Sequence, residues 1–426
     1  MVGVSATTDL AEDVRSFLRK DFKPRFGERQ REFPSHPLWR RMRELGTELW
    51  LDTGSIDETR PLWTREFTAL TTNNTLLNKE IQTGRYDGLI ARAAGFLDSG
   101  WVLSKQDRML ELAFILNAYH GLRLVEQFDA YVSVEEHTDL AGDVEGAVQY
   151  ARRYYSICPE RFIVKIPLTP AGILATRRLA AEGVPVNHTL GFSARQNNLV
   201  AQIGRPRYVN VFMGRLNQLA VENGLGDGAY IGERTTLASQ SVVSSLRRFR
   251  GVSTRQIGAS FRAAGQVRDL AGIDVMTIPP KVAQGFIDLG IRPDDLRGTR
   301  GKILEPTFAD GVDPEALRFD TLWGVEPVLV DCLEALEREN LDAFTPDDLV
   351  DFLAKHGCPD LLVRWTPEEA ATSAAEGKIP RLEHWREALA SERIGLDTLM
   401  NLAGLTSFAA DQKAMDEHVA QVLAKK

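Results

Sequence analysis

The sequence predicts an α/β protein that folds as a (β/α)8 TIM barrel with additional N-terminal and C-terminal helices. Between Thr47 and Pro280 the chain repeats one unit, in which an apolar or β-branched run is followed by a polar or glycine-containing joint and a helical pattern. Several of the runs are apolar almost throughout, which is typical of parallel strands that are covered by helices. Eight such units close naturally into a barrel.

The strands are predicted where apolar or β-branched residues continue for several positions between turn signals. The eight predicted strands cover 48–52, 67–72, 130–135, 162–167, 184–190, 207–213, 255–260 and 274–279. The alternative architecture is a doubly wound open sheet. It is disfavoured because no G-x-G-x-x-G dinucleotide-binding signature follows the first predicted strand.

The helices are predicted where apolar residues recur at i, i+3 and i+4, which is the spacing of a helix that packs on a sheet. They cover 109–128, 143–155, 171–183, 193–204, 241–249, 263–272 and 281–290. Gly183, Gly204 and Gly290 stand at or just past the ends of three of these helices, where a left-handed C-cap is expected.

The chain is expected to have three parts. These are an N-terminal helical extension (1–46), the catalytic barrel (47–290) and a mostly helical C-terminal region docked on the barrel (291–426). In the last part, Thr345 and Thr366 are each followed by proline and acidic residues, which predicts two capped helix starts. The final amphipathic helix is expected at about 406–424. A separate small helical insertion around 295–390 is left open.

Composition limits the partners and the cellular location. A net charge of −8 provides no basic field that would recruit nucleic acid or an anionic membrane. The three cysteines are far apart in sequence and no metal-ligand spacing is present, so we expect neither a disulfide framework nor a metal site. The first 22 residues lack an apolar run, and no segment approaches the ~18 apolar residues of a membrane span. We therefore expect a cytoplasmic protein.

Polar side chains stand at or near the ends of seven predicted strands, which is where a barrel of this kind carries its chemistry. They are Asp52, Asn73, Glu135, Lys165, Asn187, Thr189, Asn210, Ser260 and Arg262. Convergence in one barrel mouth would give these groups the partners that buried polar atoms need. The alternative is that each is an isolated, satisfied group near the rim. That alternative suits single residues better than it suits the whole set.

Lys165 interrupts the otherwise apolar strand in RFIVKIPL (161–168). Burial of an ammonium group is costly, and desolvation favours the neutral amine that forms a Schiff base with a carbonyl. The protonated imine is then an electron sink for carbon–carbon cleavage, so we expect neither a metal nor an organic cofactor. Asp52 and Glu135 are the candidates for the acid–base steps.

Arg215, Ser260 and Arg262 form a candidate anion clamp. Arginine forks match the geometry of phosphate oxygens, and the serine hydroxyl adds a further donor. An arginine in a sequence such as ASFR is more often part of a surface ion pair. Its position beside a barrel mouth favours the phosphate interpretation.

Seven segments resemble the motifs of the transaldolase family, in the same order along the chain. They are LWLDTGSI (49–56), LTTNNTLL (70–77), IVKIPLTPAGILA (163–175), VNHTLGFSARQ (186–196), VFMGRL (211–216), IGASFRAAGQVRDLAGIDVMTIPP (257–280) and FAADQKAMDEHV (408–419). The resemblance implies a (β/α)8 barrel with the Schiff-base lysine on the fourth strand, and Lys165 lies in the fourth predicted strand.

The resemblance also implies roles for the polar residues. Asp52 would exchange the proton of the C4 hydroxyl, and Glu135 with Thr189 would activate a proton-shuttling water. The expected substrate-binding residues are Asn73 and Asn187 for the hydroxyls or the dihydroxyacetone unit, Asn210 for the first hydroxyl, Phe212 beside the imine, and Arg215, Ser260 and Arg262 for the phosphate.

The implied reaction transfers dihydroxyacetone from sedoheptulose 7-phosphate or fructose 6-phosphate to glyceraldehyde 3-phosphate or erythrose 4-phosphate, in the pentose phosphate pathway. The partners would be phosphorylated sugars, and both a monomer and a homodimer are left open. A lyase similar to fructose 6-phosphate aldolase, a specialised sugar transaldolase and a non-catalytic sugar-phosphate sensor are the alternatives. The pairing of Phe212 with Glu135 favours transfer over release, since the related aldolases typically have tyrosine and glutamine there.

The sequence departs from the family pattern in three places. Asn74 replaces a common proline, which is expected to loosen that loop. Asn210 stands where many members have serine, although its amide can make the same hydrogen bond. The 291–407 region is much longer than in a minimal transaldolase.

Overall fold

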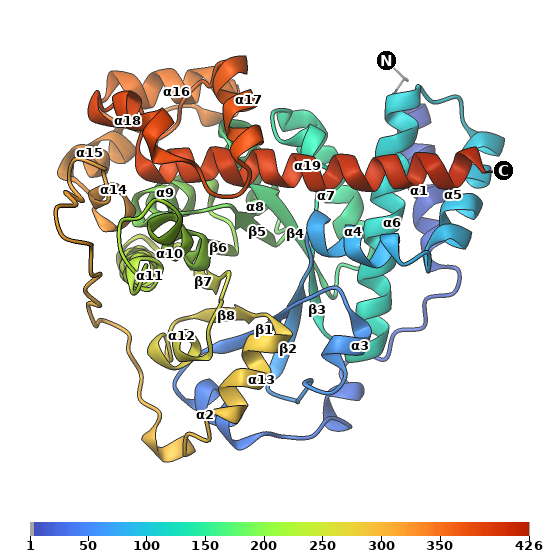
Figure 1. Cartoon of the computed structure of the whole chain (residues 1–426). Helices are drawn as coiled ribbons and strands as arrows, with labels where there is room; N and C mark the ends of the chain where they lie inside the picture. Colours follow the sequence, from blue (N-terminus) through green and yellow to red (C-terminus); the bar gives the residue numbers. More distant parts are fainter. Residues whose placement is uncertain (1–3, 426) are drawn as a thin grey trace.

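The computed structural model describes residues 4–425, and its centre is a closed barrel of eight parallel strands in sequential order (Figure 1). The predicted (β/α)8 TIM barrel is therefore confirmed. The first three residues of the expected N-terminal extension and the last residue of the C-terminal region lie outside the described residues.

The strands lie within one or two residues of the predicted bounds. They are β1 (Glu48–Asp52), β2 (Phe67–Thr71), β3 (Tyr131–Glu135), β4 (Phe162–Pro167), β5 (Val186–Thr189), β6 (Tyr208–Phe212), β7 (Arg255–Ala259) and β8 (Val275–Ile278). Strand β5 differs most from its predicted range of 184–190. It ends before Leu190, because that residue adopts a positive φ of 63°.

Alternation along the strands places one set of side chains inside the barrel. The interior is packed by an apolar cluster of Trp50, Ala69, Ile163, Tyr208, Ile257, Ala259 and Val275, with Phe212 beside it. On β1 and β4, the residues two positions after Trp50 and Ile163 are Asp52 and Lys165. These two polar side chains therefore lie on the inner face, toward the carboxyl ends of the strands.

Helices surround the barrel. Those between the strands are α3 (Ile56–Thr59), α4 (Asn74–Gln82), α5 (Asp87–Gly100), α6 (Lys105–Phe128), α7 (Val144–Ile157), α8 (Pro170–Ala181), α9 (Ala194–Leu199), α10 (Met213–Glu222), α11 (Ile231–Arg250) and α12 (Ala264–Asp269). All seven predicted helical segments contain a helix, although 193–204 ends in a π-helix from Val200 to Gly204. The sequence reading missed α3, α4, α5 and α10.

Two of the three glycine caps occur as expected. Gly183 and Gly290 have φ values of 77° and 62° after α8 and α13 (Pro280–Asp288). The expectation for Gly204 is wrong, because the π-helix adds a residue per turn and moves the left-handed position to Arg205, with φ 53°.

The remaining helices lie at the two ends of the chain. They are α1 (Val4–Arg19), α2 (Pro37–Glu44), α14 (Asp320–Trp323), α15 (Pro327–Leu336), α16 (Pro346–Lys355), α17 (Pro367–Glu376), α18 (Leu382–Ala390) and α19 (Leu396–Ala424). The predicted capping boxes at Thr345 and Thr366 are present. Helix α19 crosses the molecule and packs on α4, α5 and α17, as Figure 1 shows in red.

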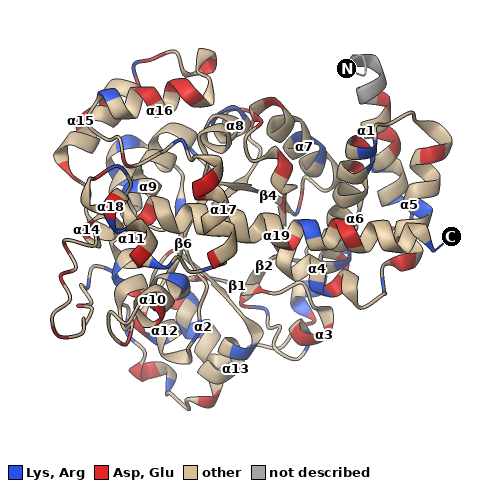
Figure 2. Ribbon diagram, turned by 45° about the horizontal axis from the view of Figure 1, so that its top comes forward, with Lys and Arg blue, Asp and Glu red and all other residues tan. Residues whose placement is uncertain are grey.

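Positive and negative residues are intermixed over the outer helices in the view of Figure 2. Cys158, Cys332 and Cys358 are buried and form no disulfide. Over residues 4–425, no helix combines the length and the apolar character that a membrane crossing requires.

Candidate active site

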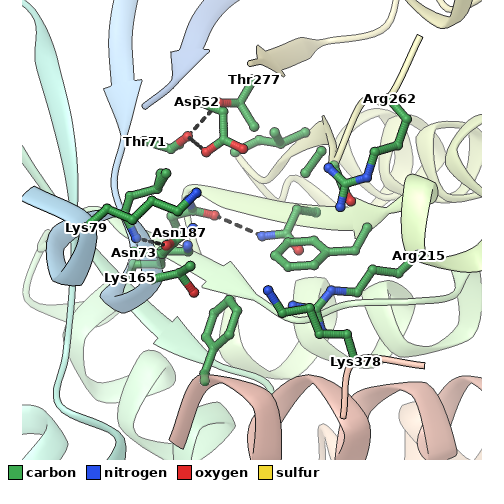
Figure 3. A pocket seen from close by; sticks show the side chains of 18 residues that line it. Asp52, Thr71, Asn73, Lys79, Lys165, Asn187, Arg215, Arg262, Thr277 and Lys378 are labelled. Atoms are coloured by element: carbon green, nitrogen blue, oxygen red, sulfur yellow. Dashed lines mark hydrogen bonds between the residues drawn. The ribbon is translucent and has the colours of Figure 1, made fainter. Parts of the chain in front are cut away.

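A cavity of about 220 Å³ opens at the carboxyl ends of the strands. Nine of the eleven predicted site residues line it, namely Asp52, Asn73, Lys165, Asn187, Asn210, Phe212, Arg215, Ser260 and Arg262. Figure 3 shows basic side chains on opposite walls of this cavity, with Asp52 between them. Glu135 and Thr189 do not line the cavity.

Lys165 is 4 % exposed and is surrounded by polar and aromatic groups. Its Nζ atom lies 3.4 Å from Oε1 of Glu135 and donates a hydrogen bond of 3.3 Å to the carbonyl oxygen of Thr72. The ring centroid of Phe408 on α19 lies 5.6 Å from Nζ. The register of β3 against β4, which pairs Glu135 with Lys165, brings the carboxylate to the amine.

Glu135 is held by the N-terminus of α4 as well as by Lys165. The backbone N–H of Asn74 donates to Oε2 of Glu135 at 2.9 Å, and the Asn74 side chain donates to the carbonyl oxygen of Glu136 at 3.4 Å. Burial raises the pKa of Glu135, and the charge of Lys165 and the Asn74 donor oppose that rise. The N–H of Asn74, which proline lacks, ties the loop to Glu135.

Asp52 lies on β1 beside Thr71 of β2, because the two residues are paired in register. The Thr71 hydroxyl donates to Oδ1 of Asp52 at 2.7 Å and lies 2.6 Å from the Thr277 hydroxyl of β8. Burial raises the pKa of Asp52, while the Thr71 hydrogen bond and the charge of Lys165 lower it. Asp52 can therefore exchange a proton with a substrate hydroxyl in the cavity.

A chain of amide hydrogen bonds connects strands β6, β5 and β3. Asn210 donates to Oδ1 of Asn187 at 3.3 Å and to the carbonyl oxygen of His188 at 3.2 Å, and Asn187 donates to the Ser133 hydroxyl at 3.1 Å. The Asn210 amide is thus held in a fixed orientation while it lines the cavity. This geometry accounts for an asparagine at a position where the resemblance leads one to expect serine.

Thr189 and Asn73 differ in their burial and in their hydrogen bonds. Thr189 is fully buried, and its hydroxyl has no hydrogen-bond partner among residues 4–425. Asn73 is the N-cap of α4, and its side chain accepts a hydrogen bond of 2.8 Å from the backbone N–H of Leu76. Its amide nitrogen is left to interact with a ligand, since only the side-chain oxygen is engaged by the cap.

The anion clamp predicted at Arg215, Ser260 and Arg262 forms one wall of the cavity. Arg215 is 6 % exposed and has no carboxylate partner within the described chain. Burial and the neighbouring charge of Arg262 lower the pKa of Arg215 to about 10. Such a guanidinium gains from a nearby anion, because the anion supplies the missing opposite charge.

The backbone around the clamp is closely packed. Ser260 has a φ of 65°, which is unusual for a residue other than glycine. A Cβ atom on Gly214, in the first turn of α10, would lie 2.0 Å from the carbonyl oxygen of Ser260. Glycine at position 214 thus allows the helix that carries Arg215 to approach the loop that carries Ser260.

Sequence reasoning missed several residues of the cavity, the most informative being Thr71, Thr277, Lys79, Lys378 and Phe408. The two threonines follow the inner-face alternation of β2 and β8, and this signal could have revealed them. Lys79 lies on the unpredicted helix α4. Lys378 and Phe408 come from the C-terminal region, for which the strand pattern provides no signal.

The site combines a buried amine, two carboxylates with raised pKa values and a wall of cations. This combination suits the capture of a carbonyl compound that carries an anionic group, with acid–base groups on both sides of the amine. In the part of the chain from residue 4 to 425, no group of three His, Cys, Asp or Glu side chains could hold a metal ion.

Comparison with known proteins shows the family of this chain. Residues 49–347 match the protein family described as "Transaldolase/Fructose-6-phosphate aldolase". The chain is 30% identical over 275 residues to a transaldolase of Xanthomonas euvesicatoria pv. vesicatoria, covering 63% of this chain and 81% of that protein. It is 29% identical over 296 residues to a transaldolase of Trichormus variabilis, covering 66% of this chain and 84% of the relative.

Proposed function

Because the chain belongs to the transaldolase/fructose-6-phosphate aldolase family and is a transaldolase enzyme, we propose that it transfers a dihydroxyacetone unit between phosphorylated sugars through a Schiff base on Lys165. The donor would be sedoheptulose 7-phosphate or fructose 6-phosphate. The acceptor would be glyceraldehyde 3-phosphate or erythrose 4-phosphate. This reaction belongs to the pentose phosphate pathway.

The observation that carries the proposal is the contact between Lys165 Nζ and Glu135 Oε1, at 3.4 Å. The amine attacks the C2 carbonyl carbon of the ketose, and the carbinolamine then loses water to give the imine. Glu135, acting through a water held with Thr189, moves the protons that this dehydration and the later hydrolysis require. Its raised pKa suits the task, because the carboxyl group then binds a proton more readily than an exposed glutamate does.

Carbon–carbon cleavage follows from the imine. Asp52 accepts the proton of the C4 hydroxyl, the C3–C4 bond breaks, and its electron pair moves into the protonated imine to form an enamine. The aldose phosphate leaves, and the enamine attacks the aldehyde carbon of the acceptor while Asp52 returns the proton. No cofactor enters these steps, since the imine nitrogen receives the electrons.

The remaining lining residues would orient the substrate. Asn73, Asn187 and Asn210 present amides to the hydroxyls, and Phe212 lies beside the imine. Arg215, Ser260 and Arg262 would bind the phosphate at the far end of the sugar. Support comes from their positions in one cavity. The separation of a cationic wall from the amine also matches a substrate with the carbonyl at one end and the phosphate at the other.

Borohydride trapping tests the Schiff base. Incubation with fructose 6-phosphate and borohydride should reduce the imine and attach the sugar or its three-carbon fragment to the Lys165 peptide, as seen by mass spectrometry. Peptides that contain exposed lysines such as Lys355 should remain unmodified and provide the internal control. An unlabelled Lys165 peptide in an enzyme preparation that turns over the substrate would refute the proposed intermediate.

The family description also includes fructose-6-phosphate aldolase, so a lyase is the second candidate function. An assay with fructose 6-phosphate, with and without erythrose 4-phosphate, separates the two. A transaldolase should form sedoheptulose 7-phosphate only when the acceptor is present. A lyase should release free dihydroxyacetone at a similar rate without the acceptor. A specialised transaldolase would instead transfer the unit between other sugars in a wider substrate panel.

A further inference from the structure

Lys378 reaches the cavity from the C-terminal region, outside the residues 49–347 that match the family. It lies in the connection between α17 and α18, beside Arg215 in Figure 3. It is a lysine from a segment whose role neither the barrel nor the family resemblance explains.

The connection that carries Lys378 is fixed to the barrel by hydrogen bonds. Asn223, at the end of α10, donates to the carbonyl oxygen of Pro380 at 3.0 Å and accepts from the backbone N–H of Leu382 at 2.8 Å. Ile379, the residue after Lys378, is 5 % exposed. Helix α10 also carries Arg215, so Lys378 and Arg215 are held relative to each other through one helix.

The cavity carries more positive charge than its own carboxylates neutralise. Lys79, Arg215, Arg262 and Lys378 all line it, and none has a carboxylate within ion-pair distance among the described residues. Elsewhere the protein pairs its buried arginines: Arg153 lies within hydrogen-bond distance of Glu111, and Arg195 of Asp360 and Asp397. Of the four cavity cations, Arg215 is buried, whereas Lys79, Arg262 and Lys378 are exposed. The buried and unpaired guanidinium of Arg215 therefore indicates an anionic ligand, and the other three cations line the same cavity.

The charged groups around Lys378 shift its pKa. Partial desolvation lowers the pKa of this exposed lysine, and the Asp411 carboxylate opposes that shift. The charges of Arg215, Lys79 and Arg262 lower the pKa further. An anion bound among these groups would reverse the repulsion and favour the ammonium form. A phosphate dianion, with three acceptor oxygens, can receive hydrogen bonds from two arginine forks and a lysine together.

We propose that Lys378 binds the phosphate group of the sugar substrate together with Arg215 and Arg262, so that the C-terminal region completes the phosphate site of the barrel. This inference rests on the proposed function for the identity of the substrate. It rests on the cavity alone for the binding of phosphate. It assigns to the 291–407 region a direct part in substrate recognition.

The test compares three variants of the complete chain. Lys378→Gln removes the charge, Lys378→Arg keeps it, and Lys355→Gln removes an exposed lysine of the same region that does not line the cavity. Titration calorimetry with inorganic phosphate measures anion binding without any turnover. Steady-state assays with fructose 6-phosphate and with unphosphorylated fructose then divide the effect between KM and kcat.

Lys378→Gln should raise the Kd for inorganic phosphate and the KM for fructose 6-phosphate by about tenfold, which is the typical effect of losing one charge-assisted hydrogen bond. The kcat value and the KM for fructose should stay within about threefold. Lys378→Arg should restore most of the phosphate affinity, and Lys355→Gln should match the unmodified enzyme.

Unchanged phosphate binding in Lys378→Gln would overturn the inference. An equal rise in KM for the phosphorylated and unphosphorylated sugars would also overturn it, since that result indicates a general structural effect. If borohydride fails to label Lys165 while Lys378→Gln still weakens phosphate binding, the proposed Schiff-base chemistry is refuted and the phosphate site is supported.

Discussion

At the scale of single residues, the Thr71 hydroxyl is the group that stabilises the ionised form of Asp52 most directly. It donates to Oδ1 of Asp52 at 2.7 Å, while burial pushes the pKa of Asp52 upward. Thr71→Val keeps the shape of the side chain and removes the donor. The pKa of Asp52 should therefore rise further, because the carboxylate loses its only hydrogen bond from a neighbouring side chain in the described residues.

We expect Thr71→Val to move the acid limb of the kcat/KM profile to higher pH, since in the proposed mechanism Asp52 is ionised when it accepts the C4 hydroxyl proton. At pH values below neutral, kcat/KM should fall by about tenfold, which corresponds to the loss of one hydrogen bond to a charged group. Thr277→Val is the matched control, because the Thr277 hydroxyl contacts Thr71 and not Asp52. Identical shifts in both variants would show that the Thr71 donor has no special role.

The same residues show what sequence can and cannot reveal at this scale. Lys165 and Asp52 could be predicted because a charged residue is conspicuous in an apolar strand. Alternation along β2 and β8 places Thr71 and Thr277 on the inner face, but it does not assign them a role, because threonine is an ordinary strand residue that packs well on a pleated surface. Their role depends on the register between β1, β2 and β8, which brings their hydroxyls together only in the folded barrel.

At the scale of elements, the N-terminus of α4 positions Glu135 through the backbone N–H of Asn74. Asn74 is the first residue of α4, where proline fits a helix without strain, and Asn73 has an extended conformation that tolerates a following proline. Asn74→Pro should consequently leave the free energy of unfolding within about 1 kcal/mol of the original value. Glu135 should lose one donor to its carboxylate, and its pKa should rise.

The measurement is the pH dependence of kcat for Asn74→Pro beside Asn74→Ala, which keeps the backbone N–H. Glu135 with a higher pKa should hold its proton to a higher pH, so the acid limb of any step that needs the carboxylate as a base should move upward. Asn74→Ala should lose only the weak 3.4 Å contact to the Glu136 carbonyl oxygen and should keep the original profile. The same profile in all three proteins would exclude the N–H of Asn74 as a determinant.

The elements themselves were predictable to different degrees. The strands could be placed closely because each is a short apolar run between turn signals. Helix α4 was not predicted from the sequence. Only Asn74, Leu77 and Ile81 are buried along its nine residues, so too few apolar residues recur to show a helical period. Helix α10 was missed because it begins at Met213, directly after β6, with no polar joint between them.

At the scale of the whole molecule, Arg195 joins the barrel to the C-terminal region. This arginine lies on α9, with its side chain 12% exposed, and contacts Asp360 at 2.9 Å and Asp397 at 2.7 Å. Asp397 is fully buried in the first turn of α19 and also accepts a hydrogen bond of 2.6 Å from the Ser193 hydroxyl. Sequence periodicity could not reveal this junction, because Arg195 is separated from both aspartates by more than 160 residues.

Asp397→Asn should break the strongest part of this junction while it preserves the size of the side chain. Removal of one partner from a buried ion pair leaves an uncompensated charge, so the free energy of unfolding should fall by about 3 kcal/mol. Arg364→Gln is the control: its guanidinium pairs with Asp347 and Asp351 at the surface, where solvent screens the charges, so the free energy of unfolding should stay close to that of the original protein. Urea denaturation measures both differences.

The junction should matter for the site as well as for stability, because α19 and the Lys378 connection both belong to the region that it anchors. In Asp397→Asn, amide hydrogen exchange should therefore accelerate across 367–390, while the strands of the barrel keep their protection. The KM for fructose 6-phosphate should rise together with that exchange. Faster exchange spread evenly over the barrel would contradict this, since it would mean that Asp397 supports the whole fold and not the attachment of one region.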